Sequence, residues 1–497
     1  MKTAVLLLAA VMVACGGDDD GGGGLGGDAS VGGGSGCAPP CARAAFNMVG
    51  PDGNDVFLVD MSGEEPGEPV RVTRESVTSA LPTGPKLLWA PSSLALAFDA
   101  EGGIYYVDLS GPVPGVPTSI VPEGLTAGWK FAWSADSRWI AFESEDAEGR
   151  RPVWAVDVSG GSPADPVALG EGGLVVGPRG LVPWHPSVSG LFMYGVTWVD
   201  LSGETPTMMP LDLTDDAPEL AWSPTGDDLA VVYYDGSNHM GVVEFDGTTF
   251  GAMRDLEGTL PPQPTSYVWS PAGSKLAYRA EDVARIADLS QDPPVTFPVG
   301  DLEATSVVGW VGDDRIAVAA AGDVFTAEVR PSSTRPPRSA TMGLGASDHA
   351  LSPDHGALVF GATVGDLDHV PHVVELDGES APRQLAQTTS DYILFSPSST
   401  KALFRVTNDS MAEWMMAERA TVGPAVSTGI VLPVSSSFLV WSPEEDRLLW
   451  RKDVFDDAGE LYYTDLRGDV SGPPMRIEPE GPDDRNVGGV AWAPSPP

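Results

Sequence analysis

The segment LAWSPTGDDLAVVYYDG, from Leu220 to Gly236, combines a tryptophan, a short stretch containing Pro and Gly, and an apolar run. Pro presets φ for a turn and Gly supplies a positive φ at low cost, so together they favour a sharp reversal between two strands. Similar segments surround Trp89, Trp133, Trp269 and Trp441. The segment therefore predicts a repeated unit in which a strand ends at Trp, the chain turns, and a second strand follows.

This unit recurs from about residue 42 to the end of the chain. After the second strand come a polar loop, a third strand that closes on Asp, a Pro-rich connection and a short fourth strand. The positions equivalent to the tryptophan are Trp89, Trp133, Trp184, Trp222, Trp269, Trp310, Leu351, Phe395, Trp441 and Trp492. Their spacing of 38 to 51 residues is the period expected for four strands per unit. We expect the Trp to pack at the seam between units, and the closing Asp to accept hydrogen bonds from the next turn.

The pattern W-S-P-x-G-x-x-[LI]-A-[FYV] resembles the repeat of TolB-type β-propellers over nearly all of this region. The resemblance implies an all-β propeller built of four-stranded blades. TolB itself carries a separate α/β domain before its propeller, and this sequence has no room for one, so the resemblance is to the repeat and not to TolB. The units at Trp184, Trp310 and Leu351 depart from the pattern individually but keep the period.

The two ends of the repeat region predict a closed ring. The region opens with AAFNMVGPDGNDVFLVDMSG, which contains a second and a third strand, and ends with VGGVAWAPSPP, which contains a Trp strand. Joined, they complete one blade and remove exposed sheet edges. We therefore expect about ten blades over residues 42–497 in one ring, with two smaller propellers as the alternative.

The charge balance excludes one class of partner. The chain has 497 residues, with 70 Asp and Glu against 28 Lys and Arg, a formal net charge of −42. Such a surface repels phosphate backbones, so we expect no nucleic acid to bind.

The N-terminus predicts export and lipid anchoring. One Lys precedes a short apolar run, Ala4 to Ala14, that fits the apolar region of a secretory signal over residues 1–14 and is too short to span a bilayer. The run ends at Met12-Val13-Ala14-Cys15, which resembles the lipobox of bacterial lipoproteins. The resemblance implies cleavage before Cys15 and lipidation of Cys15, with the body in the periplasm or on the cell surface. Residues 15–41 are rich in Gly and Asp and predict a flexible tether with a root-mean-square reach of roughly 30 Å.

Cys37 and Cys41 are the two further cysteines, in the segment CAPPC. In an exported protein the pair suits a small disulfide, and two free thiols are the alternative. Two ligands alone make a poor zinc site.

The sequence offers little sign of catalysis. It contains no G-x-S-x-G nucleophile elbow and no S-x-D-x-G-x-T-W box of the sialidase type. In the segment DLDHVPH we expect His369 and His372 to lie in a loop, where Asp366 and Asp368 are also near enough to suggest a metal site. The simpler interpretation is a polar loop, and no metal or cofactor is assigned.

The loops between the second and third strands are acidic in most units, and equivalent loops of a repeat array lie on one face. We therefore predict an acidic binding rim, represented by Asp366, Asp368, Asp456 and Asp457. A solvated surface is the alternative, and Ca²⁺ is a further one because hard cations prefer oxygen ligands, although no loop has the spacing of an EF-hand.

Two functions from different classes follow. The first is an envelope scaffold that binds a protein or peptide on a propeller face, without catalysis and without a cofactor. The second is an enzyme or a small-ligand or Ca²⁺-binding protein with its site in the central channel. A channel cluster of converging carboxylates, His or Arg favours the second, and an apolar or aromatic patch on one face favours the first.

Overall fold

The computed structural model of the chain describes residues 42–50, 53–73, 86–100, 103–174, 184–193, 197–203, 205–211, 219–234, 237–256, 267–408, 411–420, 425–433, 439–454, 457–467, 471–477 and 486–494. Every regular element within these ranges is a β-strand, and none of them forms a helix long and apolar enough to cross a membrane. The predicted all-β class is therefore confirmed.

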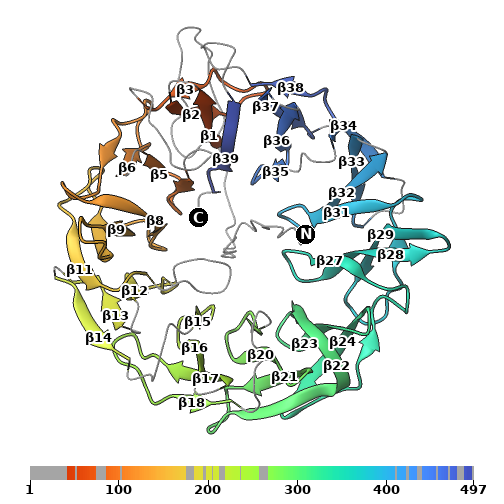
Figure 1. The fold of residues 1–497 in the computed structure, drawn as a ribbon. Helices are drawn as coiled ribbons and strands as arrows, with labels where there is room; N and C mark the ends of the chain where they lie inside the picture. Colours follow the sequence, from red (N-terminus) through yellow and green to blue (C-terminus); the bar gives the residue numbers. More distant parts are fainter. Residues whose placement is uncertain are drawn as a thin grey trace, which may run out of the picture.

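The strands form ten antiparallel blades arranged in a ring around one axis (Figure 1). Each blade is described from its innermost strand outward. Blades 1 to 3 contain β39 (Asn486–Trp492), β1 (Arg43–Gly50), β2 (Gly53–Asp60) and β3 (Val70–Arg71); β4 (Leu87–Trp89), β5 (Ala95–Ala100), β6 (Gly103–Asp108) and β7 (Thr118–Ser119); and β8 (Thr126–Trp133), β9 (Trp139–Glu145), β10 (Pro152–Asp157) and β11 (Val167–Glu171).

Blades 4 to 7 depart from the regular pattern in two places. Among the described residues, blade 4 has three strands, and in blades 6 and 7 one long strand, β22, serves as the outer strand of the first and the inner strand of the second. These blades contain β12 (Gly190–Met193), β13 (Thr197–Asp200) and β14 (Thr207–Pro210); β15 (Glu219–Trp222), β16 (Asp228–Tyr234), β17 (Asn238–Glu244) and β18 (Arg254–Asp255); β19 (Tyr267–Trp269), β20 (Lys275–Ala280), β21 (Val283–Asp288) and β22 (Val295–Val311); and β22, β23 (Arg315–Ala320), β24 (Asp323–Arg330), β25 (Ser333–Thr334) and β26 (Arg338–Ser339).

Blades 8 to 10 are regular four-stranded sheets. They contain β27 (Ser347–Leu351), β28 (Ala357–Val364), β29 (Leu367–Glu375) and β30 (Arg383–Gln384); β31 (Ser390–Phe395), β32 (Lys401–Asn408), β33 (Met411–Glu418) and β34 (Val426–Pro433); and β35 (Leu439–Trp441), β36 (Arg447–Val454), β37 (Asp457–Asp465) and β38 (Met475–Arg476).

The two ends of the repeat region share blade 1, as predicted. β1 pairs with β2 on one side and with β39 on the other, where Ala44 lies opposite Trp492 and Ala45 opposite Ala491. Figure 1 shows the blades in a single ring, with β39 between β1 and blade 10. The protein is therefore one closed propeller and not two smaller ones.

The repeated tryptophans lie at the seams between blades. In four blades the indole N–H donates, at 3.0–3.2 Å, to the carbonyl oxygen of the residue just before the equivalent Trp of the preceding blade. The pairs are Trp89 with Ala491, Trp133 with Leu88, Trp269 with Ala221, and Trp310 with Val268. Because one blade cannot bury both faces of its own sheet, this large apolar ring with one polar group both packs and links neighbouring blades.

The turns also have the predicted geometry. Gly226 and Gly273 occupy the left-handed region, with φ of 82° and 72°, four residues after their Trp. The closing aspartates accept a backbone N–H bond from two residues ahead at 2.8–3.1 Å. These aspartates are Asp60, Asp108, Asp157, Asp200, Asp288 and Asp465. The repeated Asp is thus explained by the repeated turn.

The antiparallel order gives the ring two distinct faces. The turns after the Trp strands and the connections between third and fourth strands lie on one face, which we call the turn face. The connections between second and third strands, and those from one blade to the next, lie on the opposite face, which we call the loop face. Most of the predicted acidic segments belong to the loop face.

Candidate binding face

Four consecutive blades have hairpins on the loop face that extend further than those of blades 2 and 6, while the equivalent strands β9 and β16 of blades 3 and 5 contain seven residues each. β28, β32 and β36 begin six residues after Leu351, Phe395 and Trp441 and contain eight residues each. β5 and β20 begin at the same distance from their Trp but contain six residues. At a rise of about 3.3 Å per residue, the longer hairpins extend roughly 7 Å further.

We call these longer hairpins the crest: β28–β29, β32–β33, β36–β37 and β1–β2, from blades 8, 9, 10 and 1. In each of them the two strands are paired up to a reversal of two residues. In blade 8, for example, Val364 lies opposite Leu367. The two residues between the paired strands include one aspartate in every case: Asp366, Asp409, Asp456 and Asp52. The sequence therefore places one aspartate between the paired strands of each of these four hairpins; Asp366 is described, and Asp52, Asp409 and Asp456 lie outside the described residues.

The charge of these hairpins differs from that of blade 3. There Arg150 lies within 2.6 Å of Asp146, 3.3 Å of Glu148 and 3.6 Å of Glu171, so the negative charge of that loop is partly compensated. In blade 8, Asp368 accepts a hydrogen bond from the Thr363 hydroxyl at 3.1 Å. Neither Asp366 nor Asp368 has an ion pair within the described part of the chain, so their charge remains available on the surface.

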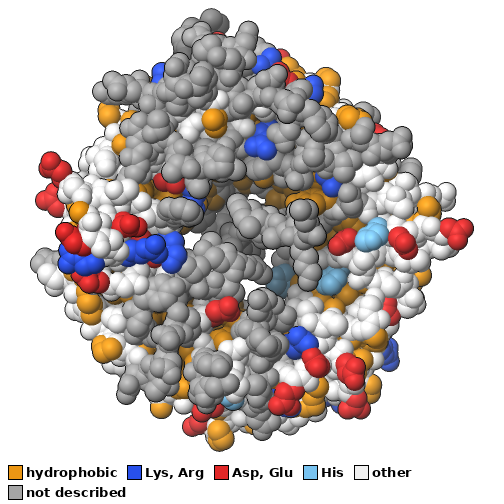
Figure 2. Space-filling view, viewed as in Figure 1, with side chains coloured by type: hydrophobic (Ala, Val, Ile, Leu, Met, Phe, Trp, Pro, Cys, Tyr) orange, Lys and Arg blue, Asp and Glu red, His pale blue; other side chains and the backbone are white. Residues whose placement is uncertain are grey.

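A histidine and a second carboxylate lie beside this hairpin. Nδ1 of His369 is 3.0 Å from Oδ2 of Asp348 and 3.0 Å from the Ser347 hydroxyl, and the Ser390 hydroxyl donates to the His369 carbonyl oxygen at 3.0 Å. Acidic and histidine side chains gather over β28 and β29 in Figure 2. Asp348 and His369 have left-handed backbones, with φ of 43° and 58°, a strained conformation for side chains of their size.

This cluster does not have the geometry of a Ser-His-Asp relay. A relay places the nucleophile and the carboxylate on opposite ring nitrogens, whereas Ser347 and Asp348 both contact Nδ1 of His369. The side chains of His369 and Asp348 are also 44% and 61% exposed, so the cluster is not shielded from water. The arrangement is suited to surface recognition through charge and hydrogen bonding.

The prediction that the segment DLDHVPH forms a loop is wrong. The structure places residues 367–372 in strand β29, because pairing with β28 continues through the polar residues. His369 is exposed, whereas His372 is buried and stacks on Phe360 with ring centroids 5.5 Å apart. The two histidines therefore cannot share one ion, and the described residues contain no group of three or more His, Cys, Asp or Glu arranged to hold a metal.

Of the remaining predicted site residues, the structure describes the position of Asp457 alone. Asp457 opens β37, directly after the reversal of the blade 10 hairpin. Asp456, the lipidation candidate Cys15, the pair Cys37 and Cys41, the signal segment and the tether lie outside the described residues. The Asp348–His369 contact was missed by sequence reasoning, because the two residues are 21 positions apart and meet only when β27 and β29 lie on either side of β28.

Cations of the inner wall contact the next blade. Nζ of Lys86 donates to the Phe131 carbonyl oxygen at 3.3 Å, and Nζ of Lys130 lies 3.1 Å from both the Leu174 carbonyl oxygen and Glu143. Burial lowers the pKa of Lys86. Each lysine is occupied by its own neighbours at a seam, so these two groups do not converge on a shared site in the channel.

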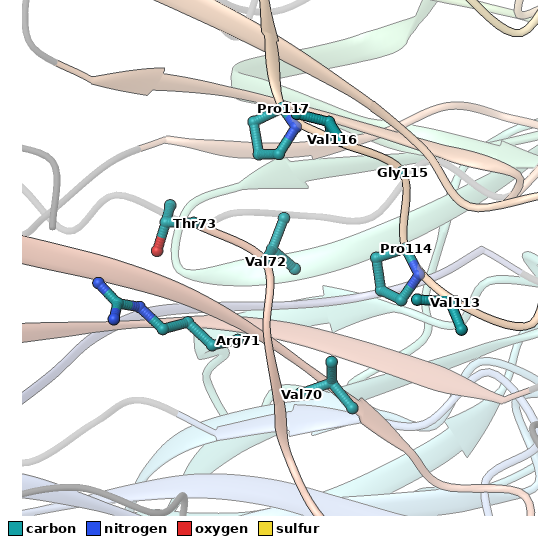
Figure 3. Close-up of a pocket in the computed structure, with 9 residues that line it drawn as sticks. All are labelled: Val70, Arg71, Val72, Thr73, Val113, Pro114, Gly115, Val116 and Pro117. Atoms are coloured by element: carbon teal, nitrogen blue, oxygen red, sulfur yellow. The ribbon is translucent and has the colours of Figure 1, made fainter. Parts of the chain in front are cut away.

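An apolar slot of about 270 Å³ lies on the outer rim, between blades 1 and 2. Figure 3 shows its walls, with Val70 and Val72 on one side and Val113, Val116 and Pro117 on the other. The nearby guanidinium of Arg71 is 2.5 Å from Asp55 and is thus already paired. Its lining offers packing for an apolar side chain and no set of converging polar groups.

Comparison with known proteins bears on the fold. No family model matches the sequence, and no curated protein matches it. Among solved structures, the chain is similar to a eukaryotic initiation factor, with 10% identity, 92% of this chain and 99% of that chain covered, and a TM-score of 0.52. It is also similar to the dihydro-heme d1 dehydrogenase NirN, with 14% identity, 78% and 73% coverage and a TM-score of 0.36. It is similar as well to a putative TolB from Agrobacterium tumefaciens, with 18% identity, 49% of this chain and 94% of that chain covered, and a TM-score of 0.28. At these identities the likeness concerns the fold alone.

Proposed function

We propose that this protein is an exported, lipid-anchored β-propeller that binds a basic protein or peptide at the crest and catalyses no reaction. The observation that carries the proposal is the crest itself. Four neighbouring hairpins extend the loop face, and each has an aspartate between its paired strands. A surface raised and charged in this way favours association with a positively charged partner.

The choice of binding over catalysis rests on the chemistry of the described residues. The only histidine–carboxylate pair described on the loop face, His369 with Asp348, is exposed and lacks relay geometry. The inner-wall lysines are paired across seams. A catalytic site needs converging groups with water excluded, and these clusters do not supply that arrangement.

Export and anchoring rest on the N-terminal sequence. The apolar run ending at Cys15 resembles a lipoprotein signal, and the following Gly- and Asp-rich stretch suits a tether. Such a tether leaves the propeller clear of the membrane, where both faces are accessible to other envelope proteins.

The proposal is tested by removing charge from one face at a time. The crest variant carries Asp366→Asn, Asp368→Asn, Asp456→Asn and Asp457→Asn. The matched variant removes four charges from exposed acids of the turn face, through Glu64→Gln, Glu68→Gln, Asp165→Asn and Glu379→Gln. A labelled octalysine peptide is titrated against each protein at low and at physiological salt, and octaglutamate serves as the peptide control.

We expect the crest variant to bind octalysine about tenfold more weakly than the parent, since an exposed charge pair contributes roughly 0.2–1 kcal/mol and four are removed. The matched variant should change less than about twofold, and the difference should shrink with salt because charges are screened over about 8 Å. Equal losses in both variants would mean that the peptide responds only to net charge, and the crest would then be a solvated surface.

A further inference from the structure

Blade 4 builds its turn on a titratable residue where six other blades use serine. In those six the residue after the Trp-equivalent position is Ser, and its Oγ accepts a backbone N–H bond from five residues ahead at 2.8–3.2 Å. The serines are Ser134, Ser223, Ser270, Ser352, Ser396 and Ser442. In blade 4 the same position is His185, directly after Trp184.

His185 uses both ring nitrogens. Nδ1 accepts hydrogen bonds from the backbone N–H groups of Ser187 at 3.1 Å and Val188 at 3.0 Å. Nε2 lies 3.0 Å from the carbonyl oxygen of Gly226, in the equivalent turn of blade 5. Because a carbonyl can only accept and an amide can only donate, this set of contacts requires the neutral imidazole with its hydrogen on Nε2.

The residue is enclosed at the seam between blades 4 and 5. His185 is 4% exposed, and its ring lies edge-on to Trp222 at 4.5 Å and to Trp198 at 6.1 Å. Gly226 has no room for a side chain, since a Cβ there would lie 2.4 Å from the ring of His185. The imidazole is therefore held in one position by packing on both sides.

Within the described part of the chain, blade 4 and its seam with blade 5 differ from several other blades in two contacts. The Trp222 indole N–H has no hydrogen-bond partner among the described residues, whereas four other blades link to the preceding blade through that group. On the channel side of β12, the described residues contribute isolated bridges at Trp184 and Leu174 in place of a continuous strand. The His185–Gly226 contact is a described polar link between blades 4 and 5.

We propose that protonation of His185 opens the seam between blades 4 and 5, which makes this point of the ring sensitive to acid. A second proton on Nδ1 removes the acceptor of two backbone N–H groups and places a donor against them. The turn at residues 185–188 then loses both hydrogen bonds, and its contact with blade 5 loosens.

Burial and the surrounding charges act on the pKa of His185 in opposite directions, and burial has the larger effect. Burial lowers the pKa of His185, while Gly226 and the exposed Asp227 act the other way. Asp228, Arg254 and Glu244 lie beyond Asp227, and Asp136 of blade 3 accepts from the Ser189 hydroxyl nearby. Trp198, Trp222 and Phe245 add no charge. The pKa of His185 in the folded state is below its ordinary value of about 6.5. Neutral His185 therefore stabilises the fold fully above about pH 6.5, and this stabilisation is lost as the pH falls below that value.

The inference concerns the integrity of the ring and is independent of the partner proposed above. It is tested by hydrogen exchange of the full chain at pH 7.5 and 5.5, with protection factors corrected for the intrinsic pH dependence of exchange. The variants are His185→Ser, which copies the other blades, and His185→Asn, which keeps one acceptor and one donor without titrating. Asp228→Asn removes the other nearby titrating group.

In the parent protein and in Asp228→Asn, we expect the protection of Ser187 and Val188 to fall by more than threefold between the two pH values, toward a limit of about tenfold for one group whose ordinary pKa is about 6.5. In His185→Ser and His185→Asn it should change less than twofold. A similar fall in these two variants, or no fall in the parent, would overturn the proposal. If one variant does not fold, the other and the Asp228→Asn comparison still decide it.

Discussion

The contribution of the inter-blade indole hydrogen bond can be measured by comparing Trp310→Phe with Trp441→Phe. Trp310 is fully buried, and its Nε1–H donates to the Val268 carbonyl oxygen at 3.0 Å. The Nε1 of Trp441 is also buried but has no partner among the described residues. Both substitutions replace an indole with a smaller aromatic ring, and because Trp441 is only partly buried, the difference between them reports on the hydrogen bond together with the deeper packing of Trp310.

The expected difference follows from the two local environments. Trp310→Phe removes a hydrogen bond worth about 1 kcal/mol and leaves the Val268 carbonyl without its donor. Trp441→Phe removes a buried N–H that had no partner, which offsets part of the packing loss. We therefore expect Trp310→Phe to be more destabilising by about 2 kcal/mol, or roughly 30-fold in the unfolding equilibrium.

Urea unfolding, followed by circular dichroism, provides the assay. The two midpoints should differ while the m-values stay equal, because the surface exposed on unfolding is nearly unchanged. Equal shifts of the midpoint, or a larger shift for Trp441→Phe, would refute the assignment of the indole as a link between blades.

Three further predictions concern single residues. Gly226→Ala should lower the unfolding midpoint far more than Gly124→Ala, because both have φ near +80° (82° and 84°) but only the first Cβ meets a side chain, that of His185 at 2.4 Å; equal shifts would contradict the packing. Burial raises the pKa of Asp228 to about 6, so Asp228→Asn should stabilise the protein above pH 6 and lose that advantage as the pH falls toward 4, where the parent carboxyl is also neutral; a gain independent of pH in urea unfolding would contradict this. Cys15→Ser should abolish lipidation, and a mutant that still partitions into the detergent phase would show that the lipobox interpretation is wrong.

The repeat was predictable because it is local. Trp, Pro and Gly at fixed spacing specify a strand, a turn and a second strand, and the half-units at the two ends specified closure. The length of the strands was harder to predict, since Asp368 and His369 look like loop residues, whereas pairing with β28 extends strand β29 through both of them. The role of His185 was also missed. Its segment was interpreted as a weakened copy of the turn, and only the contact with Gly226 shows what the imidazole does.

The contacts of His369 illustrate a second limit. Its partner Asp348 belongs to the inner strand of the same blade, and nothing in the local sequence of either residue indicates the other. Side-chain pairs across a sheet depend on register, which the hydrophobic pattern specifies for buried positions and hardly at all for polar ends of strands.

The crest spans four neighbouring blades only because the two ends of the chain share blade 1, so ring closure is the central claim. Ala45 and Ala491 are opposite each other in the β1–β39 pair and pack in the same core cluster. Antiparallel partners have Cα atoms about 4.5–5.5 Å apart, within the range of about 4.4–6.8 Å that a disulfide accepts.

The most direct measurement is oxidative cross-linking of Ala45→Cys with Ala491→Cys, in a chain whose other cysteines are changed to serine. We expect an intramolecular disulfide in nearly all molecules, detected by mass spectrometry after proteolysis. The control pair Ala45→Cys with Val490→Cys should remain reduced, because neighbouring residues of a strand point to opposite faces. Free thiols in the first pair, or equal cross-linking in both, would contradict the closed ring.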